Sequence, residues 1–176
     1  MRPPIQYARL QERFRRGSAL IEFTLVGTFI FLPLLAGLAS VGMNMVTAMQ
    51  AANLNSSAGQ MFSSGQWDAG QLQTMLPAMA GTLNSTSPGV GGVVILSEIQ
   101  NTSNGYICTQ LTPITIGNGG ATGASKYCQA GAVNPPFNMV VGQTAFIAET
   151  YYINPNLAWV FARAGTSNGI YEVAVF

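Results

Sequence analysis

The chain has 176 residues, of which 48% are hydrophobic and only 7% are charged, and its net charge is +1. Five of the seven basic residues precede Gly17, so the rest of the chain lacks the spread of basic side chains that nucleic-acid binding requires. Histidine, the commonest general base and metal ligand, is absent. We therefore expect no enzyme, no metal site and no other cofactor.

The N-terminal part reads as a short basic leader, residues 1–17, followed by a membrane-spanning helix. From Phe23 through Trp67 there is no Lys, Arg, Asp or Glu. The first part of this run exceeds the roughly 20 apolar residues that cross a bilayer as a helix. It is also longer than the apolar region of a secretory signal and lacks a clear small-residue cleavage pattern. Because basic residues mark the cytoplasmic side, we expect the N-terminus inside and the rest of the chain outside.

Beyond Val41 the pattern becomes semi-polar without a break, and polar uncharged residues alternate with methionine, valine and leucine. We interpret residues 18–62 as the membrane helix and its extension, a rod of about 60 Å at 1.5 Å per residue. Pro33 lies inside the span, where membrane helices tolerate a kink. Ser63-Ser64-Gly65 is expected to end the helix.

Residues 63–176 are expected to form a small α+β domain outside the cytoplasm. Asp68 can cap a second helix that runs to about Leu83, with Pro77 inside it. Four β-strands are predicted, and they span residues 93–99, 106–111, 143–153 and 169–176. Residues 112–141 are expected to be irregular, and residues 157–161 to form a short helix or a packed loop. Because the strands recur without helices between them, the sheet should be antiparallel.

Cys108 and Cys128 both lie in the part predicted to face an oxidising compartment. Their even number and that location favour a disulfide that closes a Gly-rich loop. The alternative is two unrelated buried thiols.

Two further groups have a functional and a simpler interpretation. Glu98, Glu149 and Glu172, one on each of three predicted strands, could pair as acid and base. Since no nucleophile or histidine joins them, we interpret them as solvent-facing charges that protect the sheet from aggregation. The aromatic residues are expected to pack in the core or at an interface, with a partner-binding patch as the alternative. These aromatic residues are Tyr151, Tyr152, Trp159, Phe161 and Tyr171.

Glu22 is the residue with the strongest functional hypothesis in the N-terminal helix. A carboxylate at the start of a membrane helix is costly and needs a partner. The simpler interpretation is a positive-inside anchor whose single glutamate lies near the interface, where its cost is small.

The residues around Glu22 resemble a known family. Two arginines, then Gly17 and, five residues on, Glu22-Phe23 resemble the start of type IV prepilins. The wider block, residues 16–23 with the apolar run and Pro33, resembles the TadE-like family of pseudopilins from tight-adherence pilus systems. This resemblance covers about the first third of the chain. Residues 146–152, followed by Asn154-Pro155, give a second, weaker similarity.

The resemblance implies an inner-membrane protein that a prepilin peptidase cuts between Gly17 and Ser18. It also implies that Glu22 and Phe23 act in assembly with other pilin or pseudopilin subunits. A cut would free an amine on Ser18, which could pair with Glu22 of a neighbouring subunit and so compensate both buried charges. Major pilins of these systems are shorter and lack a globular domain, so we expect a minor subunit or assembly factor. Some relatives keep an uncut N-terminus, and an uncleaved, membrane-anchored binding or scaffold protein is therefore the alternative.

Overall fold

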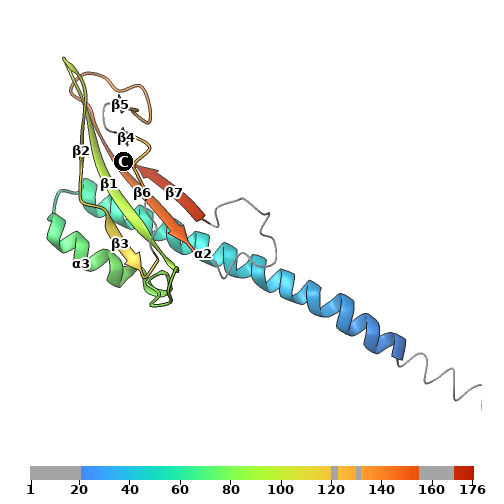
Figure 1. Ribbon diagram of the computed structural model, residues 1–176. Helices are drawn as coiled ribbons and strands as arrows, with labels where there is room; N and C mark the ends of the chain where they lie inside the picture. Colours follow the sequence, from blue (N-terminus) through green and yellow to red (C-terminus); the bar gives the residue numbers. More distant parts are fainter. Residues whose placement is uncertain (1–20, 120–122, 130–131, 155–168) are drawn as a thin grey trace, which may run out of the picture. The chain divides into compact units, whose positions relative to one another are not determined.

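The computed structural model describes residues 21–119, 123–129, 132–154 and 169–176 (Figure 1). The chain divides into two compact units, residues 1–42 and residues 43–176. The leader with Gly17 and Ser18, and the apolar patch at residues 157–161, lie outside the described residues.

The chain is helical from Ile21 to Ser63, in agreement with the predicted membrane helix and its extension. A π-helical turn, η1 (Gly27–Phe31), leads into the long α-helix α2 (Leu32–Ser63). The turn lies just before Pro33, whose ring would clash with the carbonyl of Phe29 in a regular α-helix. A π-turn inserts a wider turn at such a position, and these turns are common causes of local irregularity in helices.

The second helix, α3 (Ala69–Met79), begins as predicted with Asp68 as its N-cap. The Asp68 carboxylate accepts from the backbone N–H of Gln71 at 2.7 Å, and the Gln71 side chain accepts from the backbone N–H of Asp68 at 3.0 Å. This reciprocal capping box satisfies two backbone donors that the helix itself leaves free. The predicted last turn is a separate 3-10 helix, η2 (Gly81–Leu83).

Four strands form the antiparallel sheet that the sequence predicts, in the order β2-β1-β6-β7 (Figure 1). They are β1 (Gly91–Thr102), β2 (Gly105–Gln110), β6 (Thr144–Ile153) and β7 (Gly169–Val175). β1 and β2 form a hairpin, and β1 pairs with β6 from Gly91–Ile153 to Gln100–Thr144. The domain is therefore α+β, with its longest strands at the centre.

The prediction that residues 112–141 are irregular is wrong in part. β3 (Ile114–Gly117) continues the pairing with β1 beyond the end of β2, because β1 is twice as long as β2. β4 (Cys128–Gln129) and β5 (Ala132–Val133) form a small second sheet. Strands this short have no clear periodicity in the sequence, and they form because a neighbouring strand pairs with them.

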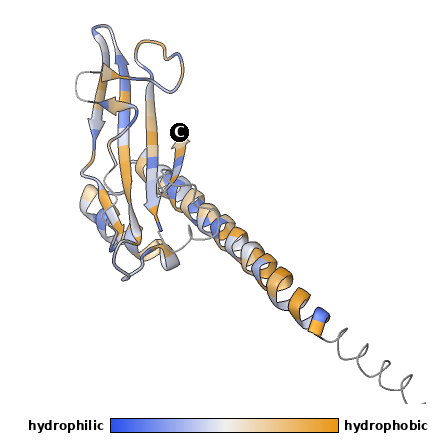
Figure 2. Cartoon of the chain, turned by 45° about the vertical axis from the view of Figure 1, so that its right-hand side comes forward, coloured by the Kyte–Doolittle hydropathy of each residue, from blue (hydrophilic) through white to orange (hydrophobic). Residues whose placement is uncertain are grey.

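One face of the sheet packs against the domain's helices, and Figure 2 shows the apolar residues of the strands in alternation with polar ones. Ala51, Leu54 and Ala58 of α2 belong to the same cluster as Val94 and Leu96 of β1. The other members of this cluster come from α3, η2, β3, β6 and the residues next to α3 and β1, and they are Leu72, Leu76, Ala80, Leu83, Val90, Ile114, Ile116, Ala148 and Tyr152.

The opposite face of the sheet carries a second, smaller apolar cluster. Its fully or almost fully buried members are Ile99, Met139, Ala145 and Ile147. Around them pack the two cysteines, with Tyr127 and Val133, all from strand β2 or from the segments between β3 and β6. Both faces of the sheet are therefore covered, one by helices and the other by non-helical chain.

Candidate functional site: the apolar helix and the buried carboxylate cluster

The large apolar residues between Ile21 and Met49 are exposed, by fractions from 41% to 77%. In the first unit they occupy neighbouring positions all around the helix rather than one stripe. They are Ile21, Phe23, Leu25, Val26, Phe29, Ile30, Phe31, Leu32, Leu34, Leu35, Leu38 and Val41. In the second unit Met43, Met45, Val46 and Met49 continue the series.

A helix that is apolar on every side is typical of a membrane span or the interior of a helix bundle. The helix from Ile21 to Ser63 is long and apolar enough to span a membrane. Figure 2 shows the hydrophobic colouring concentrated on its N-terminal part, while polar residues become frequent along the part that packs in the domain. The helix surface is therefore suited to an apolar environment.

Glu22 and Phe23 lie next to each other near the first described residue of this helix. Phe23 is the most exposed of its large apolar residues, at 77%, and Glu22 is also exposed. Glu22 is the only charged residue between Ile21 and Trp67. The helix thus carries one carboxylate on an otherwise uncharged, apolar surface.

The predicted disulfide between Cys108 and Cys128 is present, with a Cα–Cα distance of 5.9 Å. It joins β2 to β4 across the second face of the sheet. Both cysteines are half-buried beside the second apolar cluster. The bond therefore ties the chain that covers this face to the edge of the main sheet.

The interpretation of Glu149 as a solvent-facing strand charge is wrong, because its side chain is fully buried. The Ser125 hydroxyl donates to Oε2 of Glu149, and the backbone N–H of Lys126 donates to Oε1 at 2.9 Å. The Tyr171 hydroxyl also donates to Oε1, at 2.8 Å. A buried carboxylate is costly unless hydrogen bonds compensate it, and these three donors do so.

Tyrosine rings and one cation surround this carboxylate. The ammonium nitrogen of Lys126 lies 3.4 Å from the centre of the Tyr171 ring, a close cation–π contact. Burial, together with the hydrogen bond to Glu149, raises the pKa of Tyr171 well above its ordinary value of 10. Burial and the nearby Glu149 carboxylate also raise the pKa of Tyr151, whose ring lies 4.7 Å from that of Tyr171. Both hydroxyls therefore stay protonated and act as donors.

A signal for the burial of Glu149 exists in the sequence. Residues two apart in a strand share a face, so Glu149 shares its face with Ile147 and Tyr151. A carboxylate within such an apolar strand face favours burial with compensating partners. The sequence does not identify those partners, Ser125 and Lys126, because they lie 24 and 23 residues away in a Gly-rich segment.

The structure does not bring the three strand carboxylates together. The register pairs Glu98 with Phe146 and Glu172 with Thr150, which places both on the face that the helices cover. Glu149 lies on the opposite face, with the sheet between. Glu149 therefore cannot form an acid–base pair with Glu98 or Glu172, because their side chains point to opposite faces of the sheet.

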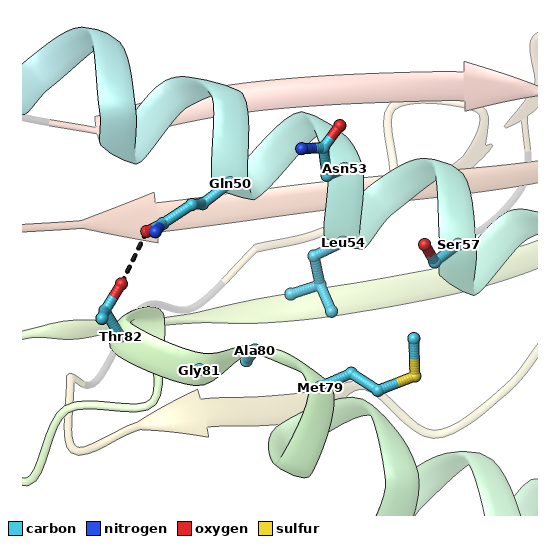
Figure 3. Close-up of a pocket in the computed structure, with 8 residues that line it drawn as sticks. All are labelled: Gln50, Asn53, Leu54, Ser57, Met79, Ala80, Gly81 and Thr82. Atoms are coloured by element: carbon cyan, nitrogen blue, oxygen red, sulfur yellow. Dashed lines mark hydrogen bonds between the residues drawn. The ribbon is translucent and has the colours of Figure 1, made fainter.

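A groove of about 200 Å³ lies between α2 and the turn that follows α3 (Figure 3). The Thr82 hydroxyl donates to the Gln50 amide oxygen across it at 2.6 Å, and Asn53 and Met79 lie further along. All of its lining residues are uncharged. Its chemistry is that of hydrogen bonding and packing rather than proton transfer.

Among the residues that the structure describes, no group of three or more His, Cys, Asp or Glu side chains is placed to hold a metal ion. Comparisons with known protein families, curated proteins and solved structures find no match to this chain. The architecture, a long apolar N-terminal helix whose C-terminal part packs on an antiparallel sheet, is nevertheless consistent with a pilin-like fold.

Proposed function

We propose that this protein is a minor pilin or pseudopilin of a tight-adherence, type IV-like pilus system. It starts in the inner membrane with its N-terminus in the cytoplasm and its α+β domain in the periplasm. It then assembles with other pilin-like subunits through its N-terminal helix. The role is structural, without catalysis.

The observation that carries the proposal is the helix surface in residues 21–41. Its large apolar residues lie on every side and are exposed, and its single carboxylate lies at its beginning. A simple anchor needs the apolar surface but not the carboxylate. The resemblance of the block around Glu22 to TadE-like pseudopilins gives this carboxylate a role, as the partner of a neighbour's freed N-terminal amine.

The first experiment determines the mature N-terminus of the protein from its native membrane, with and without the prepilin peptidase. Intact mass and N-terminal sequencing should show a chain that begins at Ser18 only when the peptidase is present. A chain that keeps residues 1–17 in both backgrounds would contradict processing.

The second experiment tests the carboxylate itself with Glu22→Gln, which keeps the size of the side chain and removes its charge. If a neighbour's amine loses its buried partner, a cost of about 3–5 kcal/mol follows. The amount of protein in sheared pili should then fall at least tenfold, while the amount in the membrane stays constant. Glu172→Gln, which removes a carboxylate from strand β7, is the matched control and should assemble normally. Wild-type assembly of Glu22→Gln would rule out the pairing.

The alternative function is an uncleaved, membrane-anchored binding or scaffold protein of the cell envelope. The structure of the domain favours it in one respect, because the domain forms a compact unit that begins at Met43. Such a unit can present a binding surface without entering a filament. Retention of residues 1–17, with normal membrane levels for Glu22→Gln, would support this alternative.

A further inference from the structure

The second face of the sheet is covered by a short segment, residues 123–129, which we call the cover segment. Gly123 lies so close to the Tyr151 ring that a Cβ there would approach Cδ2 to 2.4 Å. The Tyr151 hydroxyl donates to the carbonyl of Ala124 at 3.0 Å. The cover segment is therefore seated directly on strand β6, although it has no strand pairing with β6.

Two ties, the hydrogen bonds to Glu149 and the disulfide to Cys108, hold the cover segment. Both lie between Ser125 and Cys128. The Ser125 hydroxyl donates to Glu149 and accepts from the backbone N–H of Cys128 at 3.0 Å. Cys128 in turn carries the disulfide to Cys108 on β2. The same serine thus connects the buried carboxylate to the covalent bond.

The buried Glu149 carboxylate depends on the cover segment for most of its hydrogen bonds. Two of the three donors to Glu149 belong to the cover segment, at Ser125 and Lys126, and the third is Tyr171 of β7. If the segment lifted away, Glu149 would keep one of these donors and regain water. Opening therefore breaks the hydrogen bonds from Ser125 and Lys126 to Glu149, and the disulfide limits how far the segment can move.

We propose that the disulfide and Glu149 form one latch, which keeps the cover segment closed in the oxidised protein and lets it open after thiol–disulfide exchange. A dithiol supplies the electrons: one thiolate attacks a cysteine sulfur and forms a mixed disulfide, and the second thiol resolves it. Cys108 and Cys128 leave as thiols with the two protons, and the dithiol becomes a disulfide. Opening uncovers the apolar face around Ile99 and Ile147. The latch is independent of the proposed pilus role.

Lys126 provides a direct reporter, because it is the only lysine in the chain and lies in the cover segment. In the closed state its backbone N–H is held by Glu149. A lysine-specific endoprotease can cut only after Lys126, and it needs an extended, released backbone to do so. The rate of this single cut therefore measures opening of the latch.

The experiment uses the full chain in detergent micelles, either oxidised or reduced with dithiothreitol and then alkylated. Fragments are quantified on reducing gels, where the disulfide no longer joins them. Loss of loop closure should raise the cleavage rate about tenfold to a hundredfold in the reduced protein. Hydrogen exchange should show that the amides of β1 and β6 stay protected.

Glu149→Gln, with the disulfide intact, tests the second tie and should be cut several-fold faster than the wild-type protein. Glu98→Gln, which removes a carboxylate from the other face of the sheet, is the matched control and should be cut at the wild-type rate. Equal cleavage of oxidised and reduced protein would overturn the latch. So would loss of protection throughout β1 and β6 on reduction, or a Glu149→Gln rate no faster than that of Glu98→Gln.

Discussion

The two parts of the long helix differ in how far the rest of the protein buries their apolar side chains. Leu38, in the first unit, is 62% exposed, whereas Leu54, in the second, is 5% exposed. Residues 21–41 are apolar on every side, so no single protein surface can cover them. In residues 43–63 the buried positions Ala51, Leu54 and Ala58 form one stripe, and the sheet covers that stripe. One continuous helix thus needs an apolar environment along its first part and supplies a domain core with its second.

The largest effect that separates the two parts should come from matched leucine truncations. Leu54→Ala removes a buried side chain from the cluster between α2 and the sheet, and it should destabilise the domain by about 2–5 kcal/mol. Leu38→Ala should change the stability of the domain by less than about 0.5 kcal/mol, because Leu38 has no place in that core. Thermal unfolding of both variants in the same detergent measures the difference. Equal shifts would show that the two parts do not differ as described.

A smaller effect should come from the polar tie between α2 and the sheet. The Thr150 hydroxyl donates to the Asn55 amide oxygen at 2.9 Å, and both side chains are almost fully buried. Thr150→Val keeps the shape but removes the donor, which should cost about 1–3 kcal/mol. Thr28→Val, an exposed position of the first part, is the matched control. If Thr150→Val and the control have the same stability, the Thr150 hydroxyl is not needed, and a water or another donor satisfies the Asn55 amide oxygen.

The smallest effect distinguishes two helix glycines. At Gly59 a Cβ would lie 2.0 Å from Cε2 of Phe176, whereas at Gly42 it would meet nothing within 4 Å. Gly59→Ala must displace the Phe176 ring, and we expect a net loss of about 1 kcal/mol. Gly42→Ala should not destabilise the domain, because alanine is the better helix former by about 0.5–1 kcal/mol. Opposite signs in paired denaturant titrations would confirm the distinction, and equal losses would contradict it.

The sequence was sufficient for features that local physics decides. The charge-free run after Glu22 predicts the long helix, Asp68 predicts the start of α3, and the strands predicted at residues 93–99 and 143–153 correspond to β1 and β6. The antiparallel sheet and the disulfide followed from the order of the strands and the compartment of the cysteines. Each of these features depends on residue types that lie close together in the chain or, for the disulfide, on the one possible pairing of two cysteines.

The errors concern residues whose environment comes from distant parts of the chain. The lack of a nucleophile or histidine beside the strand glutamates favours a solvent-facing Glu149, but the cover segment buries it and supplies two of its donors. No sequence pattern predicts β3, because residues 114–117 become a strand only by pairing with the edge of β1 that β2 leaves free. The donors to Glu149 and the pairing of residues 114–117 with β1 both come from distant parts of the chain, so a window of neighbouring residues does not show them.

The sequence by itself determined that the chain has an apolar helix with one carboxylate at its beginning, followed by an α+β domain with one disulfide. Only the tertiary structure decided where that helix stops being exposed and starts to form a core. It also decided that one strand carboxylate is buried and tied to the disulfide. The physical reason is that burial is a property of both partners of a contact, whereas hydrophobic pattern and charge describe only one.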